Sequence, residues 1–400
     1  MGLERPEGAP EVERLSPGPH PDPLPKGDGE EGFSFPKGDG EEGFSFPKGD
    51  GEQESSLSNG DASTGQGAGT RGEGESVRHL PVLEVEGLKV HFPIKGGLLG
   101  RQFGTVRAVD GVSFVVRRGE TLGLVGESGC GKTTLGRAIL RLVPLTAGAV
   151  RLEGEDLASL DRRTLRQRRR KMQMVFQDPA GCLDPRMTVG EIISEPLQNY
   201  ASGTAQDRVR RVQELLKLVG LHPAHRNYYP HQMSGGMRQR VGIARALALD
   251  PVVVVADEPV SALDVSIQAQ VLNLMSSLQE KLNLTYIFIA HNLSVVKHIS
   301  DRVAVMYLGR LVEVGASEIL YRRPLHPYTR ALFSAIPVPD PEVERGRRRA
   351  LLEGEVPSPI NPPEGCRFHP RCPRAEEICR EEPPELRELE SDHLVACHFP

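Results

Sequence analysis

The chain has 400 residues and a formal charge of −5, a length that allows two domains. No apolar run in the sequence approaches the roughly 18 residues that span a bilayer, and the N-terminus lacks the charged-then-apolar pattern of a secretory signal, so we expect a cytosolic protein. The charge is unevenly distributed: residues 1–80 carry −10, which leaves +5 on residues 81–400. A mildly basic body suits an anionic ligand or a membrane surface, but it is too weak to predict nucleic-acid binding.

Residues 1–80 form a low-complexity segment rich in glycine and acidic side chains. The segment contains 17 acidic and 7 basic residues, and the unit PKGDGEEGFSF at 25–35 recurs at 36–46. Such a composition buries too little apolar surface to offset the chain entropy of folding. We predict a disordered tail, with a partner-binding role for the repeated Phe-Ser-Phe as the alternative.

The segment TLGLVGESGCGKTT at 121–134 has the pattern of a phosphate loop between a strand and a helix. Its centre matches G-x-x-x-x-G-K-[ST], and the apolar spacing of TLGRAILRLV at 134–143 predicts the helix that follows. Loop amides and the helix N-terminus bind phosphate oxygens, Lys132 would reach the β and γ phosphates, and the Thr133 hydroxyl would hold Mg²⁺. The candidate ATP-binding residues here are Gly126, Ser128, Gly129, Cys130, Gly131, Lys132, Thr133 and Thr134.

The segment VVVVADEP at 252–259 predicts a second strand of the same sheet. Successive valines are typical of a strand buried on both faces, and ligands of open α/β sheets bind at the carboxyl ends of strands. Asp257 is a candidate Mg²⁺ ligand there, and Glu258 is the candidate base that deprotonates the attacking water. Because adjacent strand residues point to opposite faces, these two roles require the alternation to relax where the strand ends. A solvated Asp-Glu pair is the alternative.

Two further segments favour nucleotide chemistry. MSGGMRQRVGIARALAL at 233–249 places Ser-Gly-Gly directly before a helix, which is an anion-binding arrangement. One ATP does not need two such helix N-termini from one chain, so we expect this one to serve a nucleotide held by another subunit. TYIFIAHNLS at 285–294 predicts a third apolar strand that ends at His291. An imidazole there could contact the γ phosphate, although a lone histidine at a strand end is more often structural.

Together with MVFQDP, which contains Gln177, and SALDVS, which contains Asp264, these segments resemble the nucleotide-binding subunit of an ATP-binding cassette (ABC) transporter. The resemblance covers about residues 82–335. It implies an α/β P-loop NTPase cassette over 81–325, with a RecA-like core, an antiparallel β subdomain and an α-helical subdomain at about 180–248. For one ATP it implies Lys132, Thr133, Gln177, Asp257, Glu258 and His291, with Thr133, Gln177 and Asp257 around Mg²⁺. For the ATP of a facing subunit it implies Ser234, Gly235 and Gly236, with Asp264 linking the two sites.

The resemblance also raises two points of detail. The family usually has glutamine after the Ser-Gly-Gly, whereas this chain has Met237, which removes a side-chain contact but leaves the backbone amides. The family stacks an aromatic ring on adenine upstream of the phosphate loop. Phe103 stands at the matching distance, with Phe92 as the alternative, and either could instead be a core residue.

Residues 326–400 are predicted to form a Pro/Cys-rich extension with little periodic structure. HPYTRALFSAIPVPDPEVER at 326–345 and GEVPSPINPPEGCRFHPRCPRAEEIC at 354–379 resemble the tail of the ATPases of oligopeptide and dipeptide permeases. The tail is most similar to that of the second of the two non-identical ATPase subunits in those systems.

Four cysteines in this extension are candidate metal ligands. Cys366, Cys372, Cys379 and Cys397 are separated by five, six and seventeen residues, which is looser than the C-x₂₋₄-C of zinc knuckles. In a reduced compartment, four thiolates at such spacing suit an iron-sulfur cluster. The resemblance likewise implies a 4Fe-4S cluster, while zinc and free or disulfide-bonded thiols are the alternatives.

The sequence therefore predicts an ATPase, peripheral on the cytoplasmic face of the cell membrane, that hydrolyses MgATP between two cassette subunits to drive uptake of oligopeptides or dipeptides. The expected partners are two transmembrane permease subunits, a second and non-identical cassette ATPase, and indirectly an extracytoplasmic solute-binding protein, without nucleic acid. The alternatives are uptake of nickel, glutathione or another non-peptide solute, a soluble cassette that acts on ribosomes or DNA, and a redox-responsive regulator.

Overall fold

The structure is a computed structural model that describes residues 81–96, 101–337 and 354–400. The tail predicted over 1–80 lies outside the described residues. Every helix in the described ranges falls short of the length and apolar character that crossing a bilayer requires.

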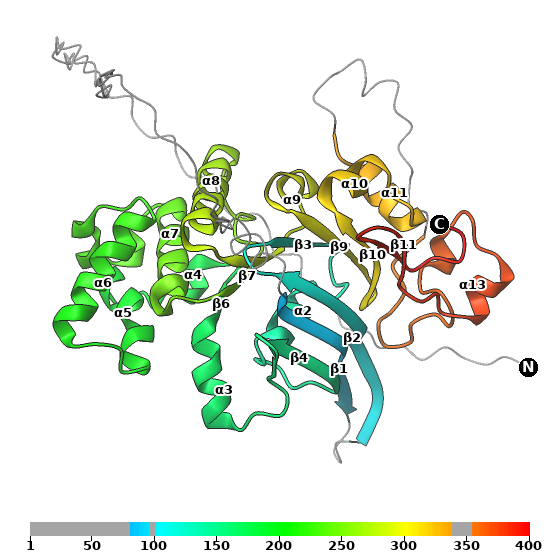
Figure 1. The fold of residues 1–400 in the computed structure, drawn as a ribbon, viewed down its shortest axis with the longest axis horizontal. Helices are drawn as coiled ribbons and strands as arrows, with labels where there is room; N and C mark the ends of the chain where they lie inside the picture. The colour runs from blue at the N-terminus through cyan, green and yellow to red at the C-terminus, as the bar shows by residue number, and fades with distance from the viewer. Residues whose placement is uncertain (1–80, 97–100, 338–353) are drawn as a thin grey trace, which may run out of the picture. The chain divides into compact units, whose positions relative to one another are not determined.

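The described strands form two sheets (Figure 1). The first is antiparallel, in the order β2-β1-β4-β5, and contains β1 (Pro81–Gly96), β2 (Arg101–Arg117), β4 (Ala147–Leu152) and β5 (Glu155–Asp156). The second has the order β11-β12-β10-β9-β3-β8-β7-β6 and contains β3 (Thr121–Val125), β6 (Met172–Val175), β7 (Val253–Asp257), β8 (Thr285–Ile289), β9 (Arg302–Tyr307), β10 (Arg310–Ala316), β11 (Arg387–Glu390) and β12 (His393–Val395). Strands β9, β3, β8, β7 and β6 are parallel neighbours, whereas β10, β12 and β11 pair antiparallel.

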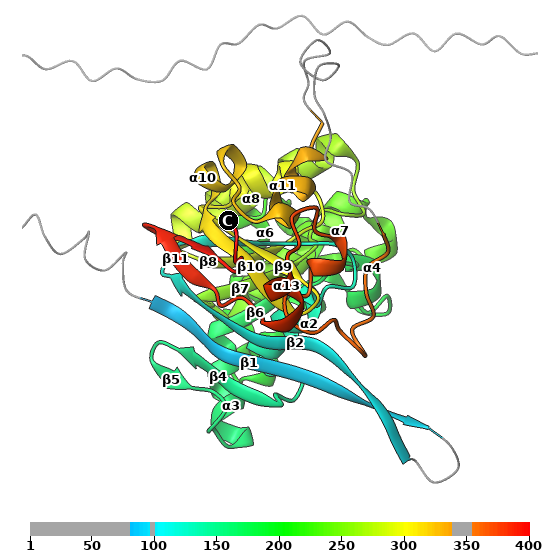
Figure 2. The ribbon, with the colours of Figure 1, turned by 90° about the vertical axis from the view of Figure 1, so that its right-hand side faces the viewer.

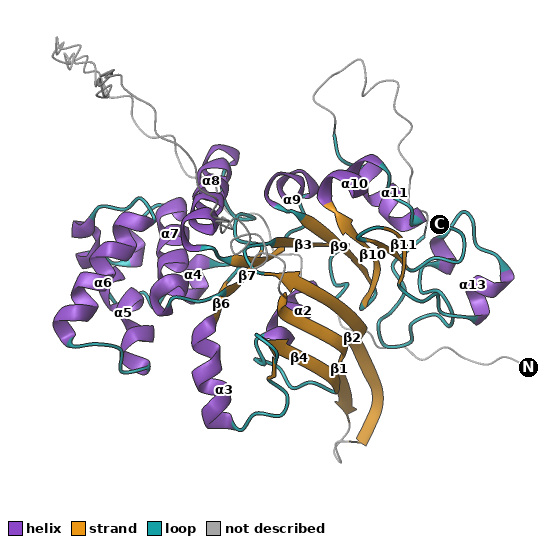
Figure 3. Cartoon of the chain, in the orientation of Figure 1, coloured by secondary structure: helices purple, strands orange, loops and turns teal. Residues whose placement is uncertain are grey.

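Helices cover the second sheet and form a separate group at one side of it (Figure 3). The helices are α2 (Lys132–Ile139), α3 (Arg162–Arg168), α4 (Pro179–Cys182), α5 (Val189–Asn199), α6 (Ala205–Leu218), α7 (Gly235–Ala246), α8 (Val265–Leu282), α9 (Leu293–Ile299), α10 (Ser317–Arg322), α11 (Pro327–Ser334) and α13 (Glu377–Glu381). Short 3₁₀ turns occupy Arg169–Lys171, Pro223–Asn227, Pro230–Gln232, Leu247–Leu249 and His369–Arg371. Helices α4 to α7 make up the group that lies away from β1, β2 and β4.

The central strands of the second sheet are buried, as their apolar composition predicts. Every residue of β7 and β8 is buried, as expected for a valine-rich strand covered on both faces. Parallel pairing brings the carboxyl ends of β3, β7 and β8 to one edge of the sheet. The loops after these strands therefore start side by side.

Helix α6 lies within the region predicted to be an α-helical subdomain. Thr204 and Asp207 form a capping box at its start, which satisfies two backbone donors of the first turn. Its apolar face is buried at Val212, Leu215 and Leu216 and, directly after its end, at Val219. Val209 differs, because it remains 47 % exposed at the edge of that face.

The described parts of the C-terminal extension, 326–337 and 354–400, pack against the second sheet (Figure 2). The extension contains α11, a helix that the sequence did not predict, and it adds β12 to the edge of β10. Glu313 of β10 is fully buried and lies 2.8 Å from the His393 ring nitrogen Nε2, while its carboxylate also accepts the backbone N–H of Leu325 at 2.7 Å. A buried carboxylate with these partners fixes the position of the last strand on the core.

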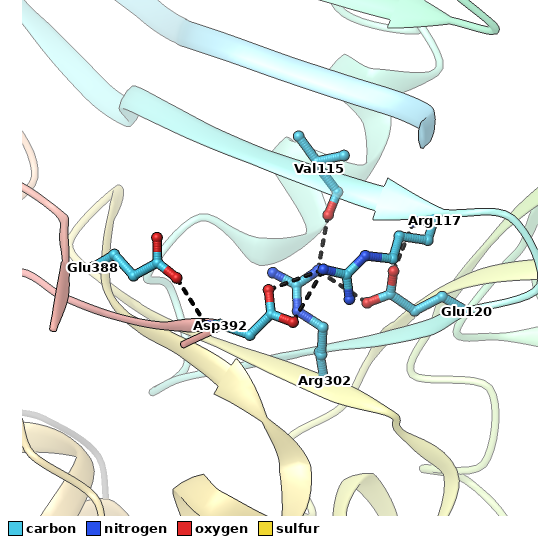
Figure 4. A network of polar contacts seen from close by, with 6 residues as sticks. All are labelled: Val115, Arg117, Glu120, Arg302, Glu388 and Asp392. Atoms are coloured by element: carbon cyan, nitrogen blue, oxygen red, sulfur yellow. Dashed lines mark hydrogen bonds and ion pairs between the residues drawn. The ribbon is translucent and has the colours of Figure 1, made fainter. Parts of the chain in front are cut away.

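A polar network joins the same extension to the first sheet (Figure 4). Arg117 of β2 donates to both carboxylate oxygens of Asp392, at 2.9 and 3.1 Å. Arg302 of β9 donates to Glu120 at 3.0 Å and to the carbonyl of Val115 at 3.1 Å. The extension is thus connected to β2, a strand that also contributes to the site described next.

Candidate functional site

A cavity of about 580 Å³, here called the phosphate-loop cavity, opens at the carboxyl ends of β3, β7 and β8. It is lined by the β1-β2 hairpin, the loop between β3 and α2 with the start of α2, the residues that follow β6, β7, β8 and β9, and one residue of the C-terminal extension. The lining residues are Phe92, Val106, Arg107, Ala108, Ser128, Gly129, Cys130, Gly131, Lys132, Thr133, Thr134, Gln177, Glu258, His291, Leu308, Gly309 and Pro359.

The loop between β3 and α2 has a tightly constrained backbone. Gly131, directly before α2, has φ of 109°, and a Cβ atom there would stand 2.1 Å from the carbonyl oxygen of Ala108, so only glycine fits. Buried Lys132 donates through Nζ to the carbonyls of Gly126 at 2.8 Å and Glu127 at 3.0 Å. The ammonium group is therefore held against the inner side of the loop, at the wall of the cavity.

Thr133 connects the loop to β7. Its hydroxyl donates to Oδ1 of Asp257 at 2.9 Å. Asp257 is only 2 % exposed, and burial raises the pKa of its carboxyl, although the Thr133 hydrogen bond acts in the opposite direction. Hydroxyl and carboxylate oxygens in contact are ligands that Mg²⁺ accepts. Asp257 does not itself line the cavity, so it would reach an ion there from behind Thr133.

Glu258 shows how two adjacent carboxylates take different directions. The strand ends at Asp257, and Glu258 adopts a left-handed backbone with φ of 46°, a conformation that a non-glycine residue rarely adopts. Its carboxylate accepts from Nε2 of Gln177 at 2.8 Å and lies 3.2 Å from Nδ1 of His291. Side chains that follow β6, β7 and β8 thus meet at one carboxylate inside the cavity, as general-base chemistry would need.

Besides Asp257, two further residues predicted for this site do not line the cavity. Gly126 lies behind the loop, where a Cβ atom would stand 2.1 Å from the carbonyl oxygen of Met306. Phe103 is 72 % exposed and is absent from the lining, whereas Phe92 is part of it. Val106 is the β2 residue nearest to Phe103 that lines the cavity, and three residues of strand correspond to about 10 Å. The geometry favours the alternative, Phe92.

The Ser-Gly-Gly segment lies outside the cavity. Ser234 is exposed at the start of α7, and its hydroxyl accepts the backbone N–H of Met237 at 3.3 Å. Gly235 and Gly236 follow it and are partly or fully covered. Asp264 precedes α8 and is exposed, and the neighbouring Val265 is 83 % exposed. These residues do not contribute to the phosphate-loop cavity of their own chain.

A second cavity, here called the cysteine cavity, holds only about 10 Å³. Its lining includes Cys366, Cys372, Cys379 and Cys397, none of which is in a disulfide. Burial raises the thiol pKa of Cys366 to about 11 and also raises those of Cys372 and Cys397. In the part of the chain that the structure describes, no group of three or more His, Cys, Asp or Glu side chains stands where it could hold a metal ion.

The structure also places residues at the cavity that the sequence did not single out. Pro359 of the C-terminal extension lines the phosphate-loop cavity, and Arg371 donates to Glu127 of the loop between β3 and α2 at 2.8 and 3.1 Å. Arg371 and Glu127 are 244 residues apart. No spacing pattern links residues at such a separation, so only the fold could reveal this contact.

Comparisons with known proteins agree with this geometry. Residues 109–261 match the family model described as ABC transporter, and residues 312–379 match the one described as oligopeptide/dipeptide transporter, C-terminal region. The chain is 55 % identical over 319 residues to the oligopeptide transport ATP-binding protein AppF of Bacillus subtilis (strain 168), covering 80 % of this chain and 97 % of that one. It is 54 % identical over 317 residues to the probable peptide ABC transporter ATP-binding protein y4tS of Sinorhizobium fredii (strain NBRC 101917 / NGR234), covering 79 % and 89 %.

A solved structure supports the fold independently. The ATP-binding cassette MJ0796, described as a dimer in a post-hydrolysis state bound to ADP and Pi, matches with a TM-score of 0.52 and 29 % identity, covering 59 % of this chain and 98 % of that one. This similarity and the first family match confirm the P-loop cassette fold predicted from the sequence.

Proposed function

The chain belongs to the ATP-binding proteins of ABC transporters, and we propose that it is the ATP-hydrolysing subunit of an importer for oligopeptides or dipeptides. The observation that carries the proposal is the convergence on one cavity of Lys132, of Thr133 with Asp257 behind it, and of Glu258 with Gln177 and His291. An ammonium group, a cation site and a base are the parts that phosphoryl transfer to water requires.

The loop binds the triphosphate. Amides of Ser128 to Thr134 and the N-terminus of α2 offer donors to the phosphate oxygens, and the Lys132 ammonium reaches the β and γ phosphates. Thr133, Asp257 and Gln177 would hold Mg²⁺, which neutralises charge that develops between these phosphates. The ion requires Asp257 in its ionised form, which burial disfavours in the empty site.

Glu258 acts on the attacking water. The water oxygen bonds to the γ phosphorus, the bond from that phosphorus to the bridging oxygen of ADP breaks, and the carboxylate of Glu258 accepts the proton of the water. Gln177 and His291 fix the orientation of this carboxylate, and His291 is exposed enough to contact the γ phosphate.

A second cassette subunit completes the proposed ATPase dimer. The exposed Ser234, Asp264 and Val265 support a facing subunit over this surface, where Ser234, Gly235 and Gly236 would contact the ATP of that subunit. The similarity to a dimeric cassette supports the same arrangement. The tail resemblance favours a non-identical partner, together with two permease subunits at the cytoplasmic face of the membrane and an extracytoplasmic solute-binding protein.

The match of residues 312–379 and the names of the relatives support peptides as the solute. The test is uptake of labelled dipeptides and tetrapeptides by cells that carry Lys132→Ala, with Lys281→Ala on exposed α8 surface as the control. Uptake lost only with Lys132→Ala supports the proposal. Unchanged peptide uptake, with loss of nickel or glutathione uptake instead, would identify a different solute.

Co-purification from gently solubilised membranes identifies the subunits, and ribosomal partners would contradict the transporter assignment.

We also infer that the four cysteines hold an iron-sulfur cluster. The support is that all four thiols line the cysteine cavity and that this donor set is typical of such clusters. Iron–thiolate bonds of a cluster would cross-link the segments that carry the four cysteines. Burial raises the thiol pKa of Cys366, Cys372 and Cys397, so binding of a cluster would have to displace protons and widen the cavity.

Anaerobic purification followed by assays of iron, acid-labile sulfide and zinc tests this inference. Iron with sulfide in a stoichiometric amount supports a cluster. Zinc without sulfide, or four titratable thiols without metal, would contradict it.

A further inference from the structure

The C-terminal extension forms part of the wall of the phosphate-loop cavity. Pro359 lines the cavity, and its carbonyl accepts the backbone N–H of Arg107 in β2 at 3.0 Å. Buried Arg367 donates to the carboxylate of Asp110 and to the carbonyl of Leu308, another lining residue. The extension thus supports the hairpin side of the cavity, where the Phe92 ring lies.

The extension also holds the phosphate loop itself, at Glu127. Both carboxylate oxygens of Glu127 accept from Arg371, at 2.8 and 3.1 Å. The backbone N–H of Glu127 donates to the hydroxyl of Tyr328 in α11 at 2.9 Å. The carbonyl of Glu127 accepts from Nζ of Lys132 at 3.0 Å and from the backbone N–H of Cys130 at 3.3 Å. All polar groups of this residue are therefore engaged, two of them by the extension.

The ion pair of Arg371 and Glu127 is partly shielded from solvent, with the Glu127 side chain 24 % exposed. The Arg371 side chain is 6 % exposed, its guanidinium carbon lies 5.9 Å from the centre of the Tyr307 ring, and the hydrogen bond to Glu127 raises the pKa of Arg371. A bidentate pair in such surroundings is stronger and more directional than a surface ion pair. It also neutralises a carboxylate in the loop that is to receive phosphates, which would otherwise be repelled.

We propose that Arg371 is a positioning residue of the nucleotide site, which fixes the phosphate loop through Glu127 and compensates the charge of that carboxylate. This inference rests on the proposed function, since it assumes that a nucleotide binds in the phosphate-loop cavity. In this proposal Arg371 does not contact the nucleotide. It affects the affinity for MgATP through the phosphate loop, and the arrangement of Gln177, Glu258 and His291 does not depend on it.

The experiment measures MgATP affinity and steady-state hydrolysis for the full chain, for Arg371→Met, and for Arg380→Met as the control. Arg380 belongs to the same extension but is exposed on α13. Arg371→Met should raise the Kd for MgATP about tenfold, the effect of one lost charge-assisted pair, while kcat at saturating MgATP changes by less than about threefold. Arg380→Met should leave both within about twofold.

A double mutant separates positioning from simple stabilisation of the extension. Adding Glu127→Gln to Arg371→Met should recover about threefold in MgATP affinity, because the uncompensated carboxylate is removed. Arg371→Lys should lie between the wild type and Arg371→Met, since lysine keeps the charge but loses the bidentate geometry. A residue that only stabilised the extension would lower the melting temperature without this recovery.

The outcomes distinguish this inference from the function on which it rests. A wild-type chain that binds no MgATP would overturn the proposed function. A wild-type chain that binds MgATP, with folded Arg371→Met binding it within twofold of wild type, would overturn the role of Arg371. Should Arg371→Met not fold, Arg371→Lys and Glu127→Gln decide the question, and unchanged affinity in both would overturn the role as well.

Discussion

The phosphate-loop cavity holds about 580 Å³, whereas the cysteine cavity holds about 10 Å³. The first is framed by backbone that hydrogen bonds fix in place, as at Lys132 and Glu127. The second is framed by thiols carried on irregular segments and on the short helix α13, and Cys366 and Cys379 are joined by one backbone hydrogen bond of 2.8 Å. A site built from backbone keeps its shape without a ligand, whereas thiols must lose their protons before they can ligate a metal. If the proposed cluster binds there, the two cavities contrast a prebuilt site with one that is completed by its metal.

The largest expected effect is on the chemistry in the phosphate-loop cavity, and it comes from a substitution of Glu258 that leaves the prebuilt loop intact. Glu258→Gln should lower ATP turnover about a thousandfold, because the amide cannot accept the proton of the attacking water. The Kd for MgATP should stay within about threefold, since the loop is untouched. Turnover assays and equilibrium binding check both effects, with Glu280→Gln on the exposed surface of α8 as the control. Near-normal turnover would show that another group is the base.

The cysteine cavity should respond in the opposite way, by losing its occupant while nucleotide binding persists. Cys372→Ser should lower bound iron about tenfold, because a hydroxyl is a poor ligand for this metal. The Kd for MgATP should change by less than about threefold, as expected if the loop is built without the metal. Cys182→Ser, outside the cysteine cavity, is the matched control. Equal iron content in the two variants would argue against a cluster bound by Cys372.

A smaller effect is expected at the adenine side of the phosphate-loop cavity, where the test is whether Phe92 already lies in position to contact the adenine ring. Phe92→Ala should weaken MgATP binding about fivefold through loss of ring stacking, whereas Phe103→Ala should leave the Kd within about twofold. Fluorescence titration of both variants measures the difference. A larger effect from Phe103 would restore the assignment made from the sequence and would require the hairpin to move when ATP binds.

The smallest expected effect concerns the stability of the empty site. Burial raises the pKa of Asp257, so its contribution to stability is present below the ordinary value of about 4 and is lost as pH rises through the folded-state pKa. At pH 7, Asp257→Asn should therefore raise the melting temperature of the ligand-free protein, by about 2 °C. The gain should shrink as pH falls and should vanish below about 4, where the carboxyl is protonated in both states. A lower melting temperature at pH 7 would contradict this balance.

The sequence predicted those parts of the site that are local. Lys132 and Thr133 lie in one continuous motif, and the buried valines before Asp257 indicate both the strand and its end. The different roles of Asp257 and Glu258 require the strand alternation to end between them. The sequence indicated this requirement, but only the structure shows the left-handed backbone of Glu258 that meets it. The identity of the aromatic wall depended on which part of a long hairpin bends over the loop, and the contact of Arg371 depended on the fold of the whole extension. Long-range contacts of this kind leave no periodic signal in a single sequence.

The buried pair of Glu313 and His393 has a consequence for the synthesis of the protein. The two residues are 80 positions apart, which a ribosome covers in about 4 to 16 s. During that interval β10 has its neighbour β9 but not β12, so one border of the second sheet presents unpaired backbone groups and Glu313 lacks its imidazole partner. Such a border is a template for pairing with other chains. In the seconds before its last strand is made, the nascent protein therefore carries an open sheet edge that the finished chain covers.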